Sequence, residues 1–573
     1  MDTATLVTLL EDRAAAQPDD RAYLFLSDRG GEEATLTYRQ LRDKARALAA
    51  RLVACTQVGD RALMIFPQGV EFMLAFFACQ VARVIAVPMM VPRRQSSRDY
   101  SANIVVDCAP AVVLTTPELA ARAEMRARFP GTPARRQGAP QWLAVDLASH
   151  EAVDGDFSPP APDDTAFLQY TSGSTSAPRG VVVSHANFIA NAAMIKASLG
   201  NTARSTHVNW VPLYHDMGLI LNALQTFYVG ALCVLMAPNA FMQRPLSWLQ
   251  AIHRYRAEVA CGPNFSFDLC VARYRAGDMQ DIDLSGLKVA LNGAEPVHAA
   301  TIESFATTFA PHGFDRHSVF PAYGMAEATL LISGGRRGAG AVTRTVSRAD
   351  LQARKVHTPS DAADAQTLVG CGRALVGEQI AIVDPDTHRR LAADRVGEIW
   401  VNGPNTARAY WRNAEATADL LQARLAGDGE TAWLRTGDLG FLDEDGEVFI
   451  TGRLKDLIII RGVNHYPQDI ERTAAGAHAA LRANGAAAFA VADAHDEEEL
   501  VIVQEVERTA RHKIDAAELT GLIRERIAEE HEVFARHIVL IRPGTLPKTT
   551  SGKVQRSLTR RLWQDGRLEV VGS

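Results

Sequence analysis

Apolar positions along this chain follow two periods, one helical and one typical of short strands. Within residues 36–54 they recur at helical spacing, at Leu36, Leu41, Ala45, Leu48 and Leu52. Short apolar runs predict strands at 61–66, 84–89 and 111–116. The segment 69–82 predicts a helix between the first two, and the alternation continues through 258–293. Strands that alternate with helices predict parallel sheets covered by helices, an α/β fold.

The pattern weakens from about 334 to 370, a segment rich in Gly, Arg, Ala, Thr and Ser that we interpret as an insertion, partly loop. After it, short alternating strands with Gly-Glu turns predict a small β-rich subdomain, at 377–384, 397–403 and 446–452. We therefore expect a large N-terminal domain, 1–454, containing two αβ-layered parallel-sheet subdomains and this β-rich unit. A small α+β C-terminal domain, 455–573, would follow.

Composition excludes several classes of protein. The chain has 573 residues, of which 47% are hydrophobic and 22% charged, and its net charge of −6 gives no basic excess for nucleic acid. Its start lacks a signal-peptide pattern. The most apolar stretch, 219–237, is interrupted by Asn222, Gln225 and Gly230, so it predicts buried core rather than an integral membrane segment. Seven scattered cysteines without zinc spacing are typical of a reduced, cytoplasmic protein.

The stretch 170–180, YTSGSTSAPRG, lies between two apolar runs and has an unusual density of Gly, Ser and Thr. Backbone N–H and hydroxyl groups in such a loop can converge on an anion, and glycines allow close approach. A flexible linker has a similar composition, but linkers seldom lie between two buried strands. The loop does not match the GxxxxGK[ST] pattern of nucleotide P-loops. We expect a phosphate-binding loop of another kind.

Later stretches carry isolated candidates for chemistry. They are Tyr323, followed four residues later by a lone acid, Glu327; Asp438, directly after a glycine; Arg453 and Lys455 at the expected domain boundary; and Lys553 near the end of the chain. Singly, each also fits an ordinary turn residue or surface charge. Their joint order along the chain favours a functional interpretation.

In this order the motifs resemble those of the adenylate-forming superfamily, which includes acyl-CoA synthetases, peptide-synthetase adenylation domains and luciferases. The resemblance covers nearly the whole chain and is specific, because at least five motifs occur in sequence. The fatty acyl-AMP ligase branch is favoured by the motifs at 170–175, 210–220, 244–270, 291–297 and 321–335, and by the insertion. Enzymes of that branch activate a fatty acid with ATP and pass the acyl group to the phosphopantetheine thiol of an acyl carrier protein.

The resemblance implies ATP and Mg²⁺ as cofactors and a role for each candidate. Glu327 would ligate Mg²⁺, a hard cation that prefers oxygen ligands, and Lys553 would bridge the fatty-acid carboxylate and the α-phosphate. The departing phosphates would be held by Thr171, Ser172, Gly173, Ser174 and Thr175. The nucleoside and α-phosphate would contact Tyr323 by stacking on adenine, Asp438 at the ribose, Arg453 at the sugar or phosphate, and Gly293, Ala294, Glu295, Gly324 and Met325.

Three further positions carry expectations from the resemblance. His215 would lie near the carboxylate and the phosphate, although a structural histidine fits the same pattern. Arg179 stands where many members carry lysine, so the charge is kept on a planar group. Lys455 matches the hinge about which the C-terminal domain moves between two half-reactions. The insertion would pack against that domain and restrain it, which disfavours coenzyme A as acceptor.

The substrate and partner follow from the same branch. A medium- or long-chain fatty acid is expected, and the apolar stretches after His215 and around 261–270 fit either an acyl tunnel or plain core. The chain carries no carrier attachment motif, so a carrier protein, or a carrier domain of a polyketide or peptide synthase, would act in trans. A fatty acyl-CoA synthetase is the main alternative. A catalytically silent nucleotide-binding interaction protein is the second, disfavoured by intact Glu327, Asp438 and Lys553.

Overall fold

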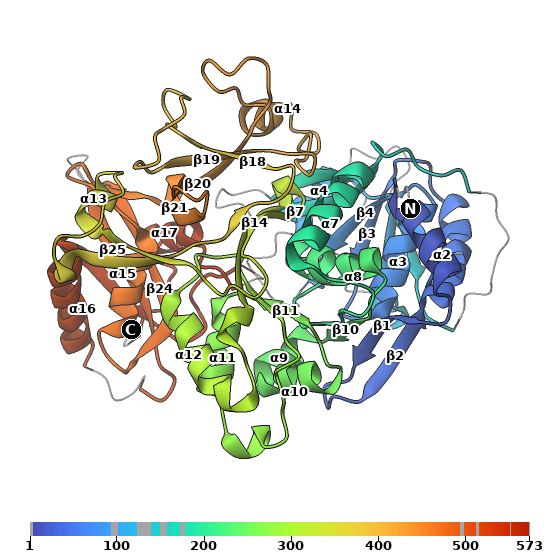
Figure 1. The fold of residues 1–573 in the computed structure, drawn as a ribbon, viewed down its shortest axis with the longest axis horizontal. Helices are drawn as coiled ribbons and strands as arrows, with labels where there is room; N and C mark the ends of the chain where they lie inside the picture. Colours follow the sequence, from blue (N-terminus) through green and yellow to red (C-terminus); the bar gives the residue numbers. More distant parts are fainter. Residues whose placement is uncertain are drawn as a thin grey trace.

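The computed structural model describes residues 4–92, 101–122, 126, 139–148, 157–171, 178–492, 498–510, 515–549 and 552–571. Two large sheets, mostly parallel, form its N-terminal part (Figure 1). One sheet has the strand order β6 (Gln141–Ala144), β5 (Val112–Thr115), β3 (Arg61–Ile65), β4 (Ile85–Met89), β7 (Thr165–Thr171) and β8 (Arg179–Ser184). Only the β7–β8 pair in it is antiparallel.

The second sheet has nine strands and is antiparallel only towards its two edges. Its order is β17 (Arg373–Ala374), β14 (Leu331–Gly334), β13 (Val319–Gly324), β12 (Val289–Asn292), β11 (Val259–Gly262), β9 (His207–Asn209), β10 (Cys233–Met236), β1 (Arg21–Leu26) and β2 (Glu32–Thr37). Together the two sheets confirm the predicted α/β fold class.

A helix that is apolar on all sides explains how the two sheets share one core. In α3 (Val70–Val81) every residue except Glu71 is buried, as expected for a helix enclosed by protein on all faces. It packs against strands of both sheets and against α1 (Leu6–Ala16) and α2 (Tyr38–Val53). The remaining helices of this part are α4 (Ser101–Cys108), α5 (Pro117–Ala120), α7 (His185–Leu199), α8 (Gln225–Val229), α9 (Pro238–Gln243), α10 (Leu246–Arg254), α11 (Asn264–Ala272) and α12 (Ala299–Phe309).

The predicted β-rich unit is a four-stranded antiparallel sheet of β18 (Gln379–Val383), β19 (Gly397–Asn402), β20 (Leu434–Leu442) and β21 (Val448–Arg453), with the short α14 (Ala414–Ala416) beside it. Its register places Asp438 directly opposite Arg453. Because facing residues on neighbouring strands have their side chains close together, this sheet brings an acid and a base into contact.

The chain after Arg453 forms a separate three-layer unit. A central sheet of β24 (Leu481–Ala492), β25 (Glu498–Val506) and β26 (Ala535–Ile541) has α15 (Pro467–Gly476) and α16 (Ala516–His531) on one face. The other face is covered by α17 (Arg556–Gln564) through Trp563. A hairpin of β22 (Ile458–Ile460) and β23 (Val463–His465) precedes it.

The insertion is more regular than the sequence predicts. It forms a β-hairpin of β15 (Thr343–Ser347) and β16 (Ala365–Val369) with α13 (Arg348–Gln352) between the strands. It also contacts the C-terminal unit through four hydrogen bonds, from Arg348 Nη1 to Glu530 O (2.7 Å), Gln366 Nε2 to Asp469 Oδ2 (3.0 Å), Asn464 Nδ2 to Gln352 O (2.6 Å) and Tyr466 OH to Leu351 O (3.2 Å). The expected packing of the insertion against that unit is therefore present.

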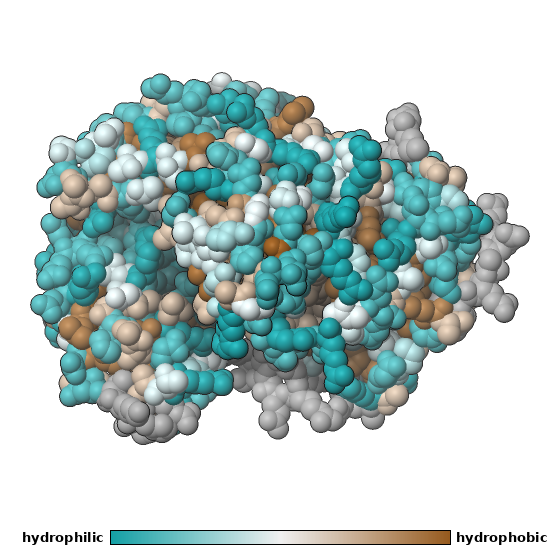
Figure 2. All heavy atoms as spheres, turned by 60° about the horizontal axis from the view of Figure 1, so that its bottom comes forward, coloured by the Kyte–Doolittle hydropathy of each residue, from teal (hydrophilic) through white to brown (hydrophobic). Residues whose placement is uncertain are grey.

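The apolar stretch 219–237 is largely buried, as predicted. It runs through most of a π-helix at Met217–Leu224, α8 and β10. In the parts of the chain that the structure describes, no helix has both the length and the apolar character needed to cross a membrane. The surface in Figure 2 is mostly hydrophilic, with hydrophobic side chains in scattered groups.

Replacing Gly218, the second residue of the π-helix, tests how tightly this region is packed. A Cβ atom there would lie 2.1 Å from the carbonyl oxygen of Pro212, so Gly218→Ala should cost about 1–3 kcal/mol of stability and lower the thermal-unfolding midpoint. Gly277→Ala is the control, because nothing lies within 4 Å of its Cβ position. Equal midpoints for the two variants would contradict the packing described here.

Candidate active site

Two neighbouring parallel strands end at the candidate site. The segment Gly293–Glu295 follows β12, and Tyr323 with Gly324 closes β13. Ligands of open α/β sheets bind beyond the carboxyl ends of such strands. The two strand ends approach closely, because a Cβ atom on Gly293 would lie 2.8 Å from the carbonyl oxygen of Ala322. Ala294 has a positive φ of 69°, a strained conformation that is common at functional sites.

Tyr323, Asp438 and Arg453 form one hydrogen-bonded group. The hydroxyl of Tyr323 donates to Asp438 Oδ2 (2.8 Å), and Arg453 Nε donates to Asp438 Oδ1 (2.9 Å). Asp438 is buried, whereas the Arg453 side chain is 47% exposed. The charge of Asp438 raises the pKa of Arg453. A carboxylate has about four acceptor positions, so Asp438 can accept further hydrogen bonds from a ligand.

Glu327 is held by a segment far away in the sequence, residues 404–410, which we call the strap. Ala407 N donates to the carbonyl oxygen of Glu327 (2.8 Å), and the Tyr410 hydroxyl donates to Glu327 Oε1 (2.9 Å). Asn405 accepts, at its carbonyl oxygen, a hydrogen bond from the hydroxyl of Thr329 (2.6 Å). The strap therefore fixes both the backbone and the carboxylate of Glu327.

Thr329 shows that this turn is strained. Its φ of 62° is rare for a β-branched residue and costs about 1–3 kcal/mol. Burial raises the pKa of Glu327, and the hydrogen bond from Tyr410 opposes that shift. The guanidinium of Arg179, at the start of β8, lies 5.5 Å from the centre of the Tyr410 ring, a cation–π distance. Arg179 is thus connected to Glu327 through Tyr410.

The turn that carries His215 is clamped from the neighbouring sheet. Gln68 Nε2 donates to Val211 O (3.0 Å) while its Oε1 accepts from Leu213 N (3.1 Å), and Gln169 Nε2 donates to Tyr214 O (2.9 Å). His215 Nδ1 lies 2.6 Å from Asp216 Oδ1. A backbone fixed in this way holds both side chains in place without relying on a ligand.

Lys553 reaches the site from the C-terminal unit. Its loop is closed by hydrogen bonds between Thr549 N and Lys553 O (2.7 Å) and between Lys553 N and Thr549 Oγ1 (3.0 Å). The loop lies against α11, because a Cβ atom on Gly552 would be 3.1 Å from Cε1 of Phe265. The charged residues that act on the Lys553 ammonium group are Arg453, Asp216, Asp438 and Glu295.

Opposing effects act on the pKa of Lys553. Burial lowers the pKa of its ammonium group, and the positive charge of Arg453 lowers it further. Asp216, Asp438 and Glu295 oppose that shift. Opposite charges nearby favour the protonated lysine, whereas burial without them favours the neutral amine.

Part of the predicted phosphate loop falls outside the described residues, namely Ser172, Gly173, Ser174 and Thr175. Its two ends are described: Thr171 closes β7 and pairs with Arg179 of β8. The loop thus starts and ends on strands, as the flanking apolar runs predict, and these two strands are neighbours in one sheet.

Glu327 fits a magnesium ligand. Among the residues that the structure describes, no group of three or more His, Cys, Asp or Glu side chains could hold a metal ion by itself. Mg²⁺ is commonly bound by one or two carboxylates together with substrate phosphates. A single buried carboxylate, oriented by Tyr410 and lying beyond a strand end, matches that pattern.

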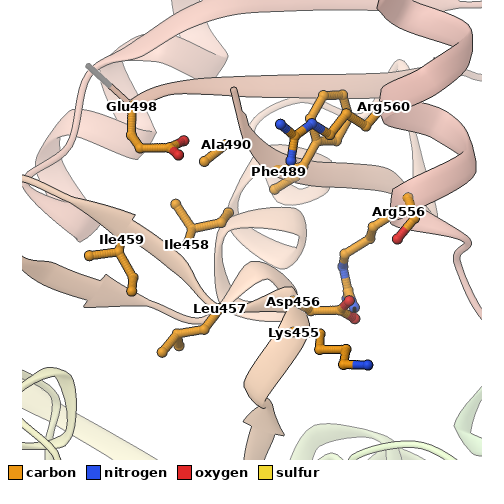
Figure 3. A pocket seen from close by; sticks show the side chains of 12 residues that line it. Lys455, Asp456, Leu457, Ile458, Ile459, Phe489, Ala490, Glu498, Arg556 and Arg560 are labelled. Carbon is orange, nitrogen blue, oxygen red and sulfur yellow. Dashed lines mark hydrogen bonds and ion pairs between the residues drawn. The ribbon is translucent and has the colours of Figure 1, made fainter. Parts of the chain in front are cut away.

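The segment around Lys455 connects β21 to the C-terminal unit and borders a pocket of about 200 Å³ (Figure 3). Arg556 and Asp456 point toward one another there, with Arg556 Nη1 donating to Asp456 Oδ2 at 2.8 Å. Arg556 also donates to both carboxylate oxygens of Glu471 (2.7 Å each). Directly after Lys455, the connection is therefore bonded to the C-terminal unit.

Comparison with known proteins identifies the class. The model of the AMP-binding enzyme family matches residues 10–411, and the model of the AMP domain of Disco-interacting protein 2-like proteins matches 455–573. The chain therefore belongs to the AMP-binding enzyme family, whose adenylate-forming members use ATP. The second match starts where the sequence predicts the C-terminal domain to start.

Individual relatives define the branch. A medium-chain-fatty-acid–[acyl-carrier-protein] ligase of Moorena producens is 41% identical over 573 residues, covering 99% of this chain and 96% of the relative. A long-chain-fatty-acid–AMP ligase of Mycolicibacterium smegmatis is 35% identical, with 99% and 96% covered. The structure of a fatty acid AMP ligase from Legionella pneumophila matches with a TM-score of 0.74 at 37% identity, covering 100% of this chain and 98% of the other. Within the family the chain groups with the fatty acyl-AMP ligases, which confirms the resemblance.

Sequence reasoning missed several residues of this site. Asp216 directly follows His215 in a motif already noted, and that adjacency was the available signal. Tyr410 is separated from Glu327 by 83 residues. Gln68 lies more than 140 residues before the turn that it clamps. No local pattern indicates contacts over such separations.

Tyr323→Phe tests the hydrogen-bonded group around Asp438. Removing the hydroxyl deletes a bond to a buried carboxylate, which is typically worth about 1.5–3 kcal/mol, so AMP should bind about tenfold more weakly in calorimetric titrations. Tyr38→Phe is the matched control, because the Tyr38 hydroxyl donates to Ala231 O within the core. Unchanged AMP affinity in Tyr323→Phe would show that this group does not serve the nucleotide.

Proposed function

We propose that this protein joins a medium- or long-chain fatty acid to AMP, releasing pyrophosphate from ATP, and then transfers the acyl group to a carrier protein. The acceptor is the phosphopantetheine thiol of a separate acyl carrier protein, or of a carrier domain in a polyketide or peptide synthase. Relatives from Moorena producens and Teredinibacter turnerae are named medium-chain-fatty-acid–[acyl-carrier-protein] ligases. The observation that carries the proposal is that the Lys553 loop of the C-terminal unit lies against Phe265 of α11, while the large domain holds Tyr323, Asp438 and Arg453 in one hydrogen-bonded group.

The first half-reaction brings two anions together. A fatty-acid carboxylate must attack the α-phosphorus of ATP while pyrophosphate leaves, so catalysis consists mainly of alignment and charge stabilisation. Lys553 bridges the two reactants, and its ammonium group stabilises the charge that moves between them. His215 meets the carboxylate from the opposite domain. Thr171 and the following loop residues, 172–175, hold the departing phosphates.

The remaining site residues bind the nucleotide. Tyr323 stacks on adenine while its hydroxyl orients Asp438 for the ribose hydroxyls. Arg453 holds the other oxygen of Asp438 and contributes a positive charge near the phosphates. The adenine and its sugar lie along Gly293, Ala294 and Glu295 and along Gly324 and Met325.

Glu327 is the proposed protein ligand of Mg²⁺. When bound, Mg²⁺ neutralises phosphate charge and orients the leaving group. Tyr410 keeps one carboxylate oxygen of Glu327 engaged, so the other is available to the metal. Arg179 supports Tyr410 from the base of the phosphate loop, which gives the arginine at this position a role.

The second half-reaction requires the thiol to reach the carbonyl that Lys553 has just served. We propose that the C-terminal domain, 455–573, then rotates about Lys455 and withdraws Lys553. The insertion contacts this domain through Arg348 and Gln366. These contacts support a restraint on the rotation. We propose that this restraint distinguishes the enzyme from a fatty acyl-CoA synthetase.

Lys553→Ala tests the proposed catalytic role. Without the bridging charge, fatty-acid-dependent pyrophosphate release should fall at least about a hundredfold, whereas ATP affinity should stay within about threefold. Lys288→Ala serves as control, because the Lys288 ammonium group donates to Ser285 O at the surface. A Lys553→Ala enzyme with the wild-type rate would refute the role of this lysine.

An acceptor panel tests the proposed second half-reaction. With ATP and dodecanoate, the wild-type enzyme should acylate a phosphopantetheinylated carrier protein and form little acyl-CoA. Replacing Arg348 and Gln366 together by alanine should raise acyl-CoA formation several-fold. Arg344→Ala is the control, because its guanidinium packs on Phe441 in the large domain. Equally efficient acyl-CoA formation by the wild type would favour the synthetase alternative.

A further inference from the structure

Asp216 directly contacts His215, one of the side chains that the proposed mechanism uses. Its side chain is only 16% exposed, and its Oδ1 lies 2.6 Å from His215 Nδ1. The same oxygen accepts a hydrogen bond from Met217 N at 2.7 Å, at the start of the π-helix. Asp216 is also one of the three carboxylates whose charges act on Lys553.

The charge state of Asp216 follows from these contacts. Burial by itself would raise the pKa of its carboxyl group, but His215, Lys553 and the Met217 N–H together lower the pKa below its ordinary value. Asp216 is therefore a carboxylate at neutral pH, and a carboxylate can only accept hydrogen bonds. The proton between Asp216 and His215 must then belong to Nδ1 of the imidazole.

This arrangement leaves a single nitrogen of His215 for the substrate. With Nδ1 bound to Asp216, Nε2 points away from that carboxylate, on a ring that is 19% exposed. The clamps from Gln68 and Gln169 hold the backbone of the turn, so the ring orientation depends on Asp216. A neutral asparagine could cap the π-helix equally well, and capping alone does not require the negative charge.

We propose that Asp216 is a positioning residue of the adenylation step: its carboxylate orients His215 through Nδ1 and receives the ammonium group of Lys553 when the C-terminal domain docks. The assignment rests on the proposed function for the identity of the step. It makes Asp216 the residue at which the two halves of the acid-binding machinery, one from each domain, meet.

Loss of the Asp216 charge is expected to change the pKa of Lys553 in one direction. The groups that act on the Lys553 ammonium are Arg453, which lowers its pKa, and Asp216, Asp438 and Glu295, which raise it. Removing one of the anions lowers the pKa of Lys553. Because bridging requires the protonated lysine, the alkaline limb of adenylation must move to lower pH in a variant without that charge.

Asp216→Asn provides the test. Fatty-acid-dependent pyrophosphate release should fall about 10- to 100-fold, and its alkaline limb should move to lower pH. Transfer of the acyl group from supplied acyl-AMP to the carrier protein should stay within about twofold of wild type, since neither cation serves that step. Asp216→Glu should restore part of the rate. Glu258→Gln is the control for loss of a partly buried charge, because Glu258 pairs with Arg337 and Ser205 before β11, at the end of the parallel strands opposite the site.

A second readout keeps the inference independent of the substrate. Competitive acetylation of Lys553 across a pH series, read by mass spectrometry, should show its amine becoming reactive at lower pH in Asp216→Asn than in wild type or Glu258→Gln. An unmoved Lys553 titration, or equal slowing of adenylation and transfer, would overturn the role of Asp216. A wild-type enzyme that fails to adenylate any fatty acid would instead refute the proposed function, while the labelling would still decide the role of Asp216.

Discussion

The structure depends on one costly interaction, the insertion of a lysine from one domain into the largely buried site of another. Burial and Arg453 both act against a charged Lys553, and Asp216, Asp438 and Glu295 supply the compensating negative charge. All three acids belong to the large domain, whereas the lysine arrives on a loop of the small one. Docking therefore lowers the pKa of Lys553, and the three acids limit that decrease, which couples the protonation of the lysine to domain position.

The surrounding structure can be understood as support for that coupling. The two glutamine clamps hold the turn of His215 and Asp216, and the strap holds Glu327 in a strained turn. Neither arrangement uses the C-terminal domain, so the large domain is preorganised before docking. The insertion then adds contacts that keep the small domain close. Rigid parts on one side and a restrained mobile part on the other suit an enzyme that must form an acyl-adenylate and then release it to a carrier.

The sequence predicts those features that depend on local pattern. Alternating strands and helices predict the sheets, and the order of Tyr323, Asp438 and Lys553 predicts the class of site. It does not predict the contact of Tyr410 with Glu327, or of Gln68 with the His215 turn, because these pair residues that only the fold brings together. The ordered hairpin in the insertion was also missed, since its strands are short and polar and are stabilised by neighbouring domains. The roles of Ser172 to Thr175 and the domain boundary at 454 stay predictions.

The central claim is that docking serves adenylation and that transfer requires the small domain to leave. Cysteines at positions 366 and 469, whose native side chains hydrogen-bond across the insertion and the small domain, can be joined by a short thiol-cleavable crosslinker. Cys55, the one native cysteine that is not buried, is first replaced by serine. The crosslinked enzyme should form one equivalent of acyl-AMP and no acylated carrier protein, and cleavage of the link should restore transfer. Transfer at the uncrosslinked rate while the link is intact would contradict the account.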